Sequence, residues 1–174
     1  MAILEIKRYP ESVLQKNAKP IEDIDGTLQR LIDDMVETMY AAPGVGLAAP
    51  QVGVLDRLLV IDINSAREED EPKERYPLIV LINPEITLSE GEASAEEGCL
   101  SLPGYSTGVK RAECVSVKGF DREGKPIIIE GEGLLARALQ HEIDHLNGML
   151  LIDRISSIKR EFFKKRFQKA LAKA

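Results

Sequence analysis

The sequence lacks any apolar run long enough to span a membrane, and its first residues, Met1–Ile6, include no basic segment that leads into such a run. From these absences we expect neither a membrane-spanning protein nor a secretory signal. The sequence also lacks internal repeats and low-complexity segments. With 174 residues, of which 44% are hydrophobic and 30% charged, the composition predicts one cytoplasmic domain, residues 1–174, with no membrane partner.

Cysteine and histidine are scarce, with two of each. Two cysteines cannot form a disulfide framework, and as unpaired thiols they suit a reducing compartment. Both histidines, His141 and His145, belong to one motif, His-Glu-x-x-His. In a helix the two imidazoles share one face, whereas Glu142 lies about 100° around the helix and can act on water instead of the metal. A core helix gains nothing from a carboxylate beside two titratable rings, so the motif predicts a hydrolytic metal site.

A catalytic metal of this kind needs a third protein ligand. No histidine remains, because Leu151 stands where an extended motif would place one, three residues beyond Gly148. The third ligand must therefore be a cysteine or a carboxylate. Cys99 is the better cysteine, because the turn-rich stretch Glu96–Gly104 can aim a thiolate at a helix. Cys114 lies in an alternating strand pattern and is interpreted as a small apolar filler.

The periodicities predict an α+β fold, with mainly antiparallel sheets packed around a buried metal-binding helix and an amphipathic helix at the C-terminus. A helix that begins near Asp25 or Thr27 carries an apolar stripe, and residues 134–146 form the metal-binding helix. Strands are expected at residues 58–61, 78–82, 113–119 and 126–130. A turn at Gly124 joins the last two in a hairpin. Residues 64–77 are dense in charge and contain two prolines, which predicts an exposed loop.

Charge is divided unevenly along the chain. Residues 154–174 contain eight basic residues and one acid, for a net charge of +7, whereas the other 153 residues contain 15 basic and 28 acidic residues, for a net charge of −13. Five apolar residues recur through this basic segment at helical spacing: Ile155, Ile158, Phe162, Phe167 and Leu171. A helix packed on the body would explain the spacing but not the single sign of charge, so a polyanionic partner is an equal alternative.

Three separated segments resemble the signature motifs of the bacterial peptide deformylases, in the family's order. They are Gly44-Val45-Gly46-Leu47-Ala48-Ala49-Pro50-Gln51, Glu97-Gly98-Cys99-Leu100-Ser101 and Gln140-His141-Glu142-Ile143-Asp144-His145. The His-Glu-x-x-His motif alone is weakly specific, whereas the three segments together are very specific. Similarity extends over nearly the whole chain and includes Tyr9-Pro10, Ile82–Glu85, Asp121–Pro126 and the basic C-terminal helix.

The resemblance implies a metal-dependent hydrolase that removes the N-terminal formyl group from formyl-methionyl nascent polypeptides and releases formate. It implies that Cys99, His141 and His145 hold one Fe(II) ion per chain, which Zn(II), Ni(II) or Co(II) can replace. Ligand chemistry alone, one thiolate with two imidazoles, favours zinc. The resemblance also implies ribosome binding through the C-terminal helix, and we expect a monomer.

Glu142 is expected to accept a proton from the attacking water and to pass it to the departing amine. By their matched positions in the family motifs, the Gln51 side-chain amide and the Leu100 backbone N–H stabilise charge on the formyl oxygen. For the substrate, the resemblance implies backbone contacts and a methionine pocket that involve Val45, Gly46, Gly98, Leu134, Ala138 and His141.

Two other functions are weighed against this one. A zinc endopeptidase using the same helix would need a downstream ligand, and Glu161, on a basic helix, is the only acid beyond Asp153. A non-enzymatic ribosome-binding module with a structural metal would need a fourth protein ligand and would leave Glu142 without a role.

Arg137 lies on the same helical face as the two histidines, where a buried guanidinium needs a carboxylate partner. Glu96 and Glu97, beside Cys99, are the nearest candidates. Our hypothesis is that Arg137 pairs with Glu97 and supports Cys99 from behind the metal ligands.

Overall fold

The computed structural model describes residues 1–66 and 77–173. Its helices are η1 (Ser12–Gln15), α1 (Gly26–Ala41), η2 (Ala49–Val52), η3 (Ile63–Ala66), α2 (Gly133–Leu146), η4 (Leu151–Arg154) and α3 (Ser157–Ala172). Its strands are β1 (Gly46–Ala48), β2 (Leu58–Ile61), β3 (Ile79–Glu90), β4 (Ala93–Cys99), β5 (Leu102–Arg111), β6 (Cys114–Phe120) and β7 (Pro126–Glu132). None of the helices in this described part is long and apolar enough to cross a membrane.

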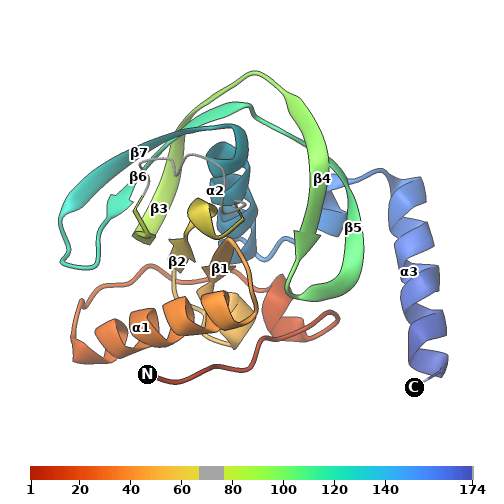
Figure 1. Ribbon diagram of the computed structural model, residues 1–174, viewed down its shortest axis with the longest axis horizontal. Coiled ribbons are helices and arrows are strands. Elements are labelled where there is room, and N and C mark those ends of the chain that lie inside the picture. Colours follow the sequence, from red (N-terminus) through yellow and green to blue (C-terminus); the bar gives the residue numbers. More distant parts are fainter. Residues whose placement is uncertain (67–76, 174) are drawn as a thin grey trace.

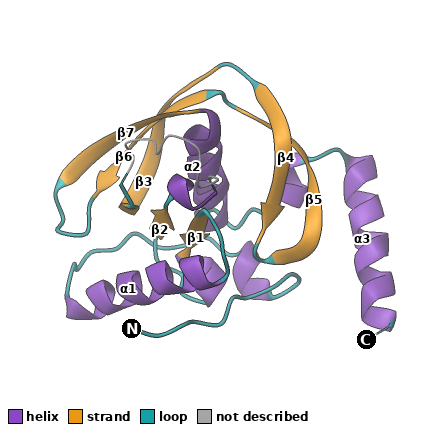
Figure 2. Cartoon of the chain, viewed as in Figure 1, coloured by secondary structure: helices purple, strands orange, loops and turns teal. Residues whose placement is uncertain are grey.

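The strands form two antiparallel sheets. Five of them pair in the order β1-β2-β3-β6-β7, and β4 pairs with β5 in a separate two-stranded sheet. Only Gly91–Glu92 separates β3 from β4, and only Ala112–Glu113 separates β5 from β6. The chain therefore passes almost directly from the five-stranded sheet into the two-stranded sheet and back. Figures 1 and 2 show α2 between the two sheets. This confirms the expected α+β arrangement around the metal-binding helix.

The five-stranded sheet is buried on both faces at its β1–β2 end, where all residues of both strands are buried. Leu59 and Ile61 pack in the cluster that includes the apolar residues of α2. Leu58 and Val60 point the other way and pack with those of α1. The period of two thus distributes one strand between two hydrophobic cores.

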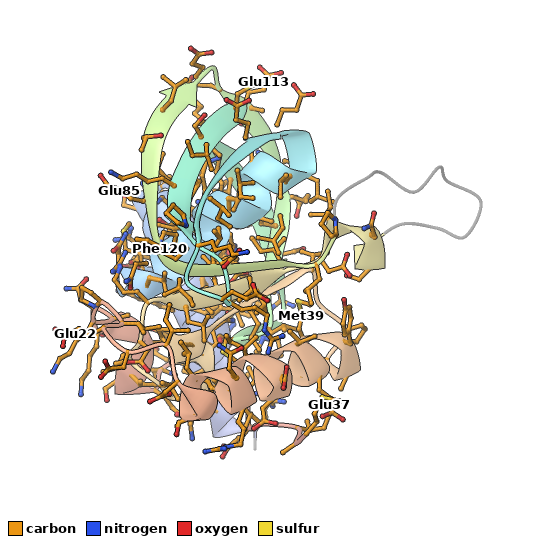
Figure 3. All side chains as sticks on the ribbon, turned by 90° about the vertical axis from the view of Figure 1, so that its left-hand side faces the viewer. Glu22, Glu37, Met39, Glu85, Glu113 and Phe120 are labelled. Atoms are coloured by element: carbon orange, nitrogen blue, oxygen red, sulfur yellow. The ribbon has the colours of Figure 1, made fainter. Side chains whose placement is uncertain are left out.

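Helix α1 begins where the sequence predicts, because the Asp25 side chain accepts a hydrogen bond from the backbone N–H of Leu28 and caps the helix. Its apolar stripe faces the sheet. Met39, fully buried, lies between α1 and the sheet in Figure 3, which views the molecule from the side. The predicted hairpin is also present, with Gly124 at a φ of 85° in the turn between β6 and β7.

Two predictions about the strands need correction. The strand expected at 78–82 continues as β3 to Glu90, and the stretch read as turn-rich is mostly the β4–β5 hairpin. Cys99 is the last residue of β4, and Pro103 and Gly104, expected in a turn, lie inside β5. Of the loop expected at 64–77, residues 67–76 lie outside the described residues, while 64–66 belong to η3.

Helix α3 forms as expected but packs through a different residue. Phe163 is 6% exposed, and its ring centroid lies 5.2 Å from that of Tyr9 and 4.7 Å from that of Tyr105. Phe167 also contacts Tyr9, and Ile155 packs on the same cluster. The other expected contacts are 58–69% exposed, namely Ile158, Phe162 and Leu171.

Candidate metal centre

Helix α2 carries both histidines on a buried face. Most of its other buried positions are apolar and pack against the five-stranded sheet, which fixes the helix in the core. His141 and His145 are 9% and 1% exposed, and their Nε2 atoms lie 3.3 Å apart. The four-residue spacing therefore directs two imidazole nitrogens at one point.

Cys99 reaches this point from the other sheet. The pairing of β4 with β5 shifts register between Gly98 and Cys99, and the Cys99 Sγ lies 3.4 Å from Nε2 of His145. Among residues 1–66 and 77–173, Cys99, His141 and His145 form the one group of three candidate ligands, with their ligand atoms within 4.8 Å of one another. Tetrahedral ligands bonded to zinc at about 2.0–2.3 Å lie roughly 3.3–3.6 Å apart, so this spacing fits one metal ion with three protein ligands.

Glu97 orients His141. Its Oε1 lies 2.9 Å from Nδ1 of His141, which turns Nε2 toward the ligand cluster. Arg111 holds the same carboxylate through two contacts of 2.6 and 2.9 Å. Burial acts to raise the pKa of Glu97, but the hydrogen bonds from His141 and Arg111 outweigh it and lower the pKa to about 2. Glu97 is thus an anion at neutral pH.

The pKa values of the two imidazoles are shifted in opposite directions. Burial, together with the positive charges of His141 and Arg111, lowers the pKa of His145 well below its usual value. For His141, burial opposes the charged form, but hydrogen bonds to Cys99 and Glu97 raise the pKa well above its usual value. A metal binds neutral imidazole, so metal binding at this site competes with a proton at His141.

Glu142 lines the same cavity as Cys99 and His141 without being one of the three candidate ligands. The side chain is 4% exposed, and its Oε2 has no hydrogen-bond partner among the described residues. Burial raises the pKa of Glu142 to about 7, although the charges of His141 and Arg111 act in the opposite direction. A carboxylate with a pKa near neutrality and a free oxygen is suited to accept and return a proton.

Gly46 makes room for this carboxylate. A Cβ added at Gly46 would lie 2.7 Å from Oε1 of Glu142 and 3.0 Å from its Cγ. The first signature segment therefore contacts the third, and a side chain at position 46 would compete with Glu142 for the same space.

Gln51 and Leu100, the expected oxyanion donors, lie beside the ligand cluster. Gln51 is 1% exposed, and its Oε1 accepts a hydrogen bond from the backbone N–H of Ala48. Its Nε2 lies 3.2 Å from the Ser101 hydroxyl and 3.7 Å from the Cys99 Sγ. Leu100, next to Cys99, lines the same cavity as Gln51.

A cavity of about 790 Å³ opens at the cluster, a size that suits a short peptide. It is lined by all six residues expected in substrate binding, which are Val45, Gly46, Gly98, Leu134, Ala138 and His141. Leu134 is 45% exposed and Ala138 5%, so the first can contact a bound side chain and the second lies deeper. One wall is β1, an edge strand of its sheet that can pair with an extended peptide.

Sequence reasoning found Arg137 but missed Arg111. Arg137 pairs with Glu97 as hypothesised, with Nη1 2.5 Å from Oε2. Arg111, 6% exposed on β5, bridges Glu97 and Asp144. A signal was available, because Arg111 follows the buried Val109 by two residues in a strand and so points to the same face.

Cys114 and Glu161, the two alternative metal ligands considered in the sequence, lie outside the cluster of Cys99, His141 and His145. Cys114 lies on β6 opposite Glu132, where partial burial and the charges of Glu113, Glu132 and Glu90 raise the pKa of its thiol and disfavour a thiolate ligand. Glu161 is exposed on α3, so the downstream carboxylate that an endopeptidase would need is not at the site.

Comparisons with known proteins agree with one another. The family model described as polypeptide deformylase matches residues 3–161. The peptide deformylase of Thermodesulfovibrio yellowstonii is 66% identical over 168 residues, covering 97% of this chain and 98% of the relative. The crystal structure of a peptide deformylase from Legionella pneumophila superposes with a TM-score of 0.86 at 51% identity, covering 99% of both chains. That of the Ehrlichia chaffeensis enzyme in complex with actinonin gives 0.88 at 40% identity, covering 98% of both.

Proposed function

Because the chain belongs to the peptide deformylase family, it hydrolyses the N-terminal formyl group of formyl-methionyl nascent polypeptides and releases formate, and we propose how its residues divide this work. One observation carries the proposal. Glu142, with one buried oxygen that has no hydrogen-bond partner among the described residues, lines the same peptide-sized cavity as the candidate ligands Cys99 and His141. The endopeptidase alternative is not favoured, since its ligand candidate Glu161 is exposed on α3.

In this proposal Cys99, His141 and His145 hold one metal ion. When bound, the ion acts as a Lewis acid on the formyl oxygen and lowers the pKa of a water molecule. Glu142 accepts the proton of the attacking water on its free oxygen and delivers it to the departing amine nitrogen. A pKa near 7 lets one carboxylate perform both transfers at neutral pH.

The Gln51 side-chain amide and the Leu100 backbone N–H stabilise the negative charge on the formyl oxygen. Support comes from the Gln51 Nε2, which is directed to the Cys99 side of the cavity because its Oε1 is held by Ala48. Donors fixed in this way need no reorganisation when the charge develops.

The substrate lies along β1 as an added strand, with the backbones of Val45, Gly46 and Gly98 as hydrogen-bonding partners. Its methionine side chain enters the cavity against Leu134, Ala138 and His141. The native ion is Fe(II), one per chain, and Zn(II), Ni(II) or Co(II) can replace it, because a thiolate and two imidazoles accept each of these metals.

The reaction is tested with a formyl-methionyl peptide, from which the iron-loaded protein should release one formate per peptide. A peptide of the same composition that carries an N-terminal acetyl group in place of formyl should not be cleaved at its internal peptide bonds. Cleavage of the acetylated peptide without formate release would favour the endopeptidase instead.

Replacing Gly46 with alanine should lower kcat by about 10²-fold while the metal content is unchanged, because the added methyl group displaces the Glu142 carboxylate. The matched control is Gly108→Ala, where an added Cβ meets no atom within 4 Å. Formate release and metal stoichiometry are measured for both. Equal rates would show that Glu142 does not depend on the space at position 46.

We propose further that the enzyme is a cytoplasmic monomer formed by one domain, residues 1–174, and that its basic C-terminal helix, 154–174, binds the ribosome. Six basic residues are placed to neutralise phosphates: Lys159, Arg160, Lys164, Lys165, Arg166 and Lys169. Figure 1 shows α3 at the edge of the molecule, beside β5 and away from α1.

Deleting residues from Ile158 onward should sharply weaken ribosome binding and leave hydrolysis of a short peptide largely intact, because every proposed catalytic residue precedes Gly148. Since the deletion also removes Phe163, a second variant replaces Lys164, Lys165 and Lys169 with glutamate and keeps the aromatic contacts. Pelleting with ribosomes at two salt concentrations measures the effect. Salt-insensitive binding that survives both changes would end the phosphate proposal.

A further inference from the structure

The β4–β5 hairpin supplies one of the three candidate ligands but shares no strand pairing with the five-stranded sheet. Two ligands, His141 and His145, sit on α2, whereas Cys99 sits at the end of β4. The separation between the Cys99 Sγ and the imidazoles therefore depends on how the hairpin is attached to α2 (Figure 1).

Four residues on one face of α2 attach the helix to the hairpin, namely Arg137, Gln140, His141 and Asp144. The Gln140 side-chain amide exchanges two hydrogen bonds with the backbone of Ala112, which follows β5. His141 contacts Glu97 on β4, and Asp144 contacts Arg111 on β5. The fourth residue is Arg137, at the end of α2 nearest to the start of β4.

Arg137 is the only one of the four that touches both strands of the hairpin. Its Nη2 donates to the carbonyl of Ala93 on β4, and its Nη1 donates to the carbonyl of Val109 on β5, each at 2.9 Å. Nη1 also pairs with Glu97, and the side chain is 11% exposed. A planar guanidinium with several donors in fixed directions can hold two backbones and a carboxylate together, which a single ammonium cannot do.

We infer that Arg137 is a positioning residue that clamps the β4–β5 hairpin to α2 and thereby determines how long the metal stays bound. The inference rests on the proposed metal centre. Release of the ion requires a ligand to withdraw, and Cys99 is the candidate ligand that the hairpin carries, so it can withdraw with the hairpin while α2 stays in place. Glu97 keeps Arg111 and His141 when Arg137 is removed, so the fold should tolerate the change.

The test uses the cobalt-loaded full-length protein, whose thiolate absorption band reports on the Cys99–metal bond, and follows its loss to excess chelator. Arg137→Met should release cobalt about ten-fold faster or more, as expected on removing a residue that supports the metal ligands. Arg137→Lys should release cobalt at a rate between those of Arg137→Met and the unchanged protein. The control is Arg122→Met, because Arg122 is a partly buried arginine that pairs with Asp33 and Gln29 far from the cluster. It should match the unchanged protein.

Thermal unfolding separates clamping from general stability. A clamp predicts that metal loading raises the Tm of Arg137→Met less than that of the unchanged protein. Equal cobalt release from Arg137→Met and Arg122→Met, or a Tm lowered equally with and without metal, would overturn the inference. If Arg137→Met does not fold, the release rate of Arg137→Lys decides in the same way. Absence of the thiolate band in the unchanged protein would instead overturn the metal centre itself and, with it, the clamp.

Discussion

Replacing Glu142 with alanine should reduce formate release by about 10²–10⁴-fold, the usual contribution of a positioned general acid–base group, and leave one metal ion per chain. The reason is geometric. Glu142 lines the cavity beside Cys99 and His141 and has an oxygen that bonds to no described residue, but it is not one of the three residues whose ligand atoms converge. Formate assays and metal analysis on the same preparation measure both quantities.

The control for this experiment is Glu130→Ala, a change of the same kind on β7, which lies on the far side of α2 from the β4–β5 hairpin in Figure 1. It should leave both activity and metal content unchanged. If Glu142→Ala instead bound less than one metal ion per chain, Glu142 would be a ligand or a structural residue, and the proton-transfer role would be withdrawn.

Replacing Cys99 with serine should weaken metal binding by more than about 100-fold, because a hydroxyl is a poor substitute for a thiolate. This loss is larger than that expected on replacing a residue that only hydrogen-bonds to a metal ligand. Cys114→Ser is the matched variant. Cys114 lies on β6 among acidic residues that raise the pKa of its thiol, and it should retain metal like the unchanged protein. Equilibrium dialysis with a competing chelator gives both affinities. Equal loss from the two variants, or loss from Cys114→Ser alone, would contradict the assignment.

The parts of the site that follow from local pattern were predictable. The spacing of His141 and His145 places both rings on one helical face, and the alternation after residue 113 defines the β6–β7 hairpin. The preference for Cys99 over Cys114 also follows from sequence, although the reason given was incomplete. Cys99 ends a strand and is brought to α2 by a second sheet.

The remainder depends on contacts between distant segments. The β4 sequence, Ala-Ser-Ala-Glu-Glu-Gly-Cys, has no β-branched or aromatic residue, so its strand arises from pairing with β5 and not from propensity. The fit of Gly46 against Glu142 joins residues 96 positions apart in the sequence, and no periodicity encodes it. Phe162 and Phe163 are adjacent, and only the aromatic pocket formed by Tyr9 and Tyr105 decides which of them is buried.

The division of charge makes this molecule an electric dipole. A tail of +7 at one edge and a remainder of −13 respond oppositely to a phosphate surface, so the field attracts α3 and repels the rest of the chain. At physiological salt such fields act over about 8 Å, so the protein can rotate relative to a charged surface before it contacts that surface. Under the proposed ribosome binding, an encounter with RNA would begin with α3 leading and the acidic body held outward, so that electrostatic torque orients the approach before any contact has formed.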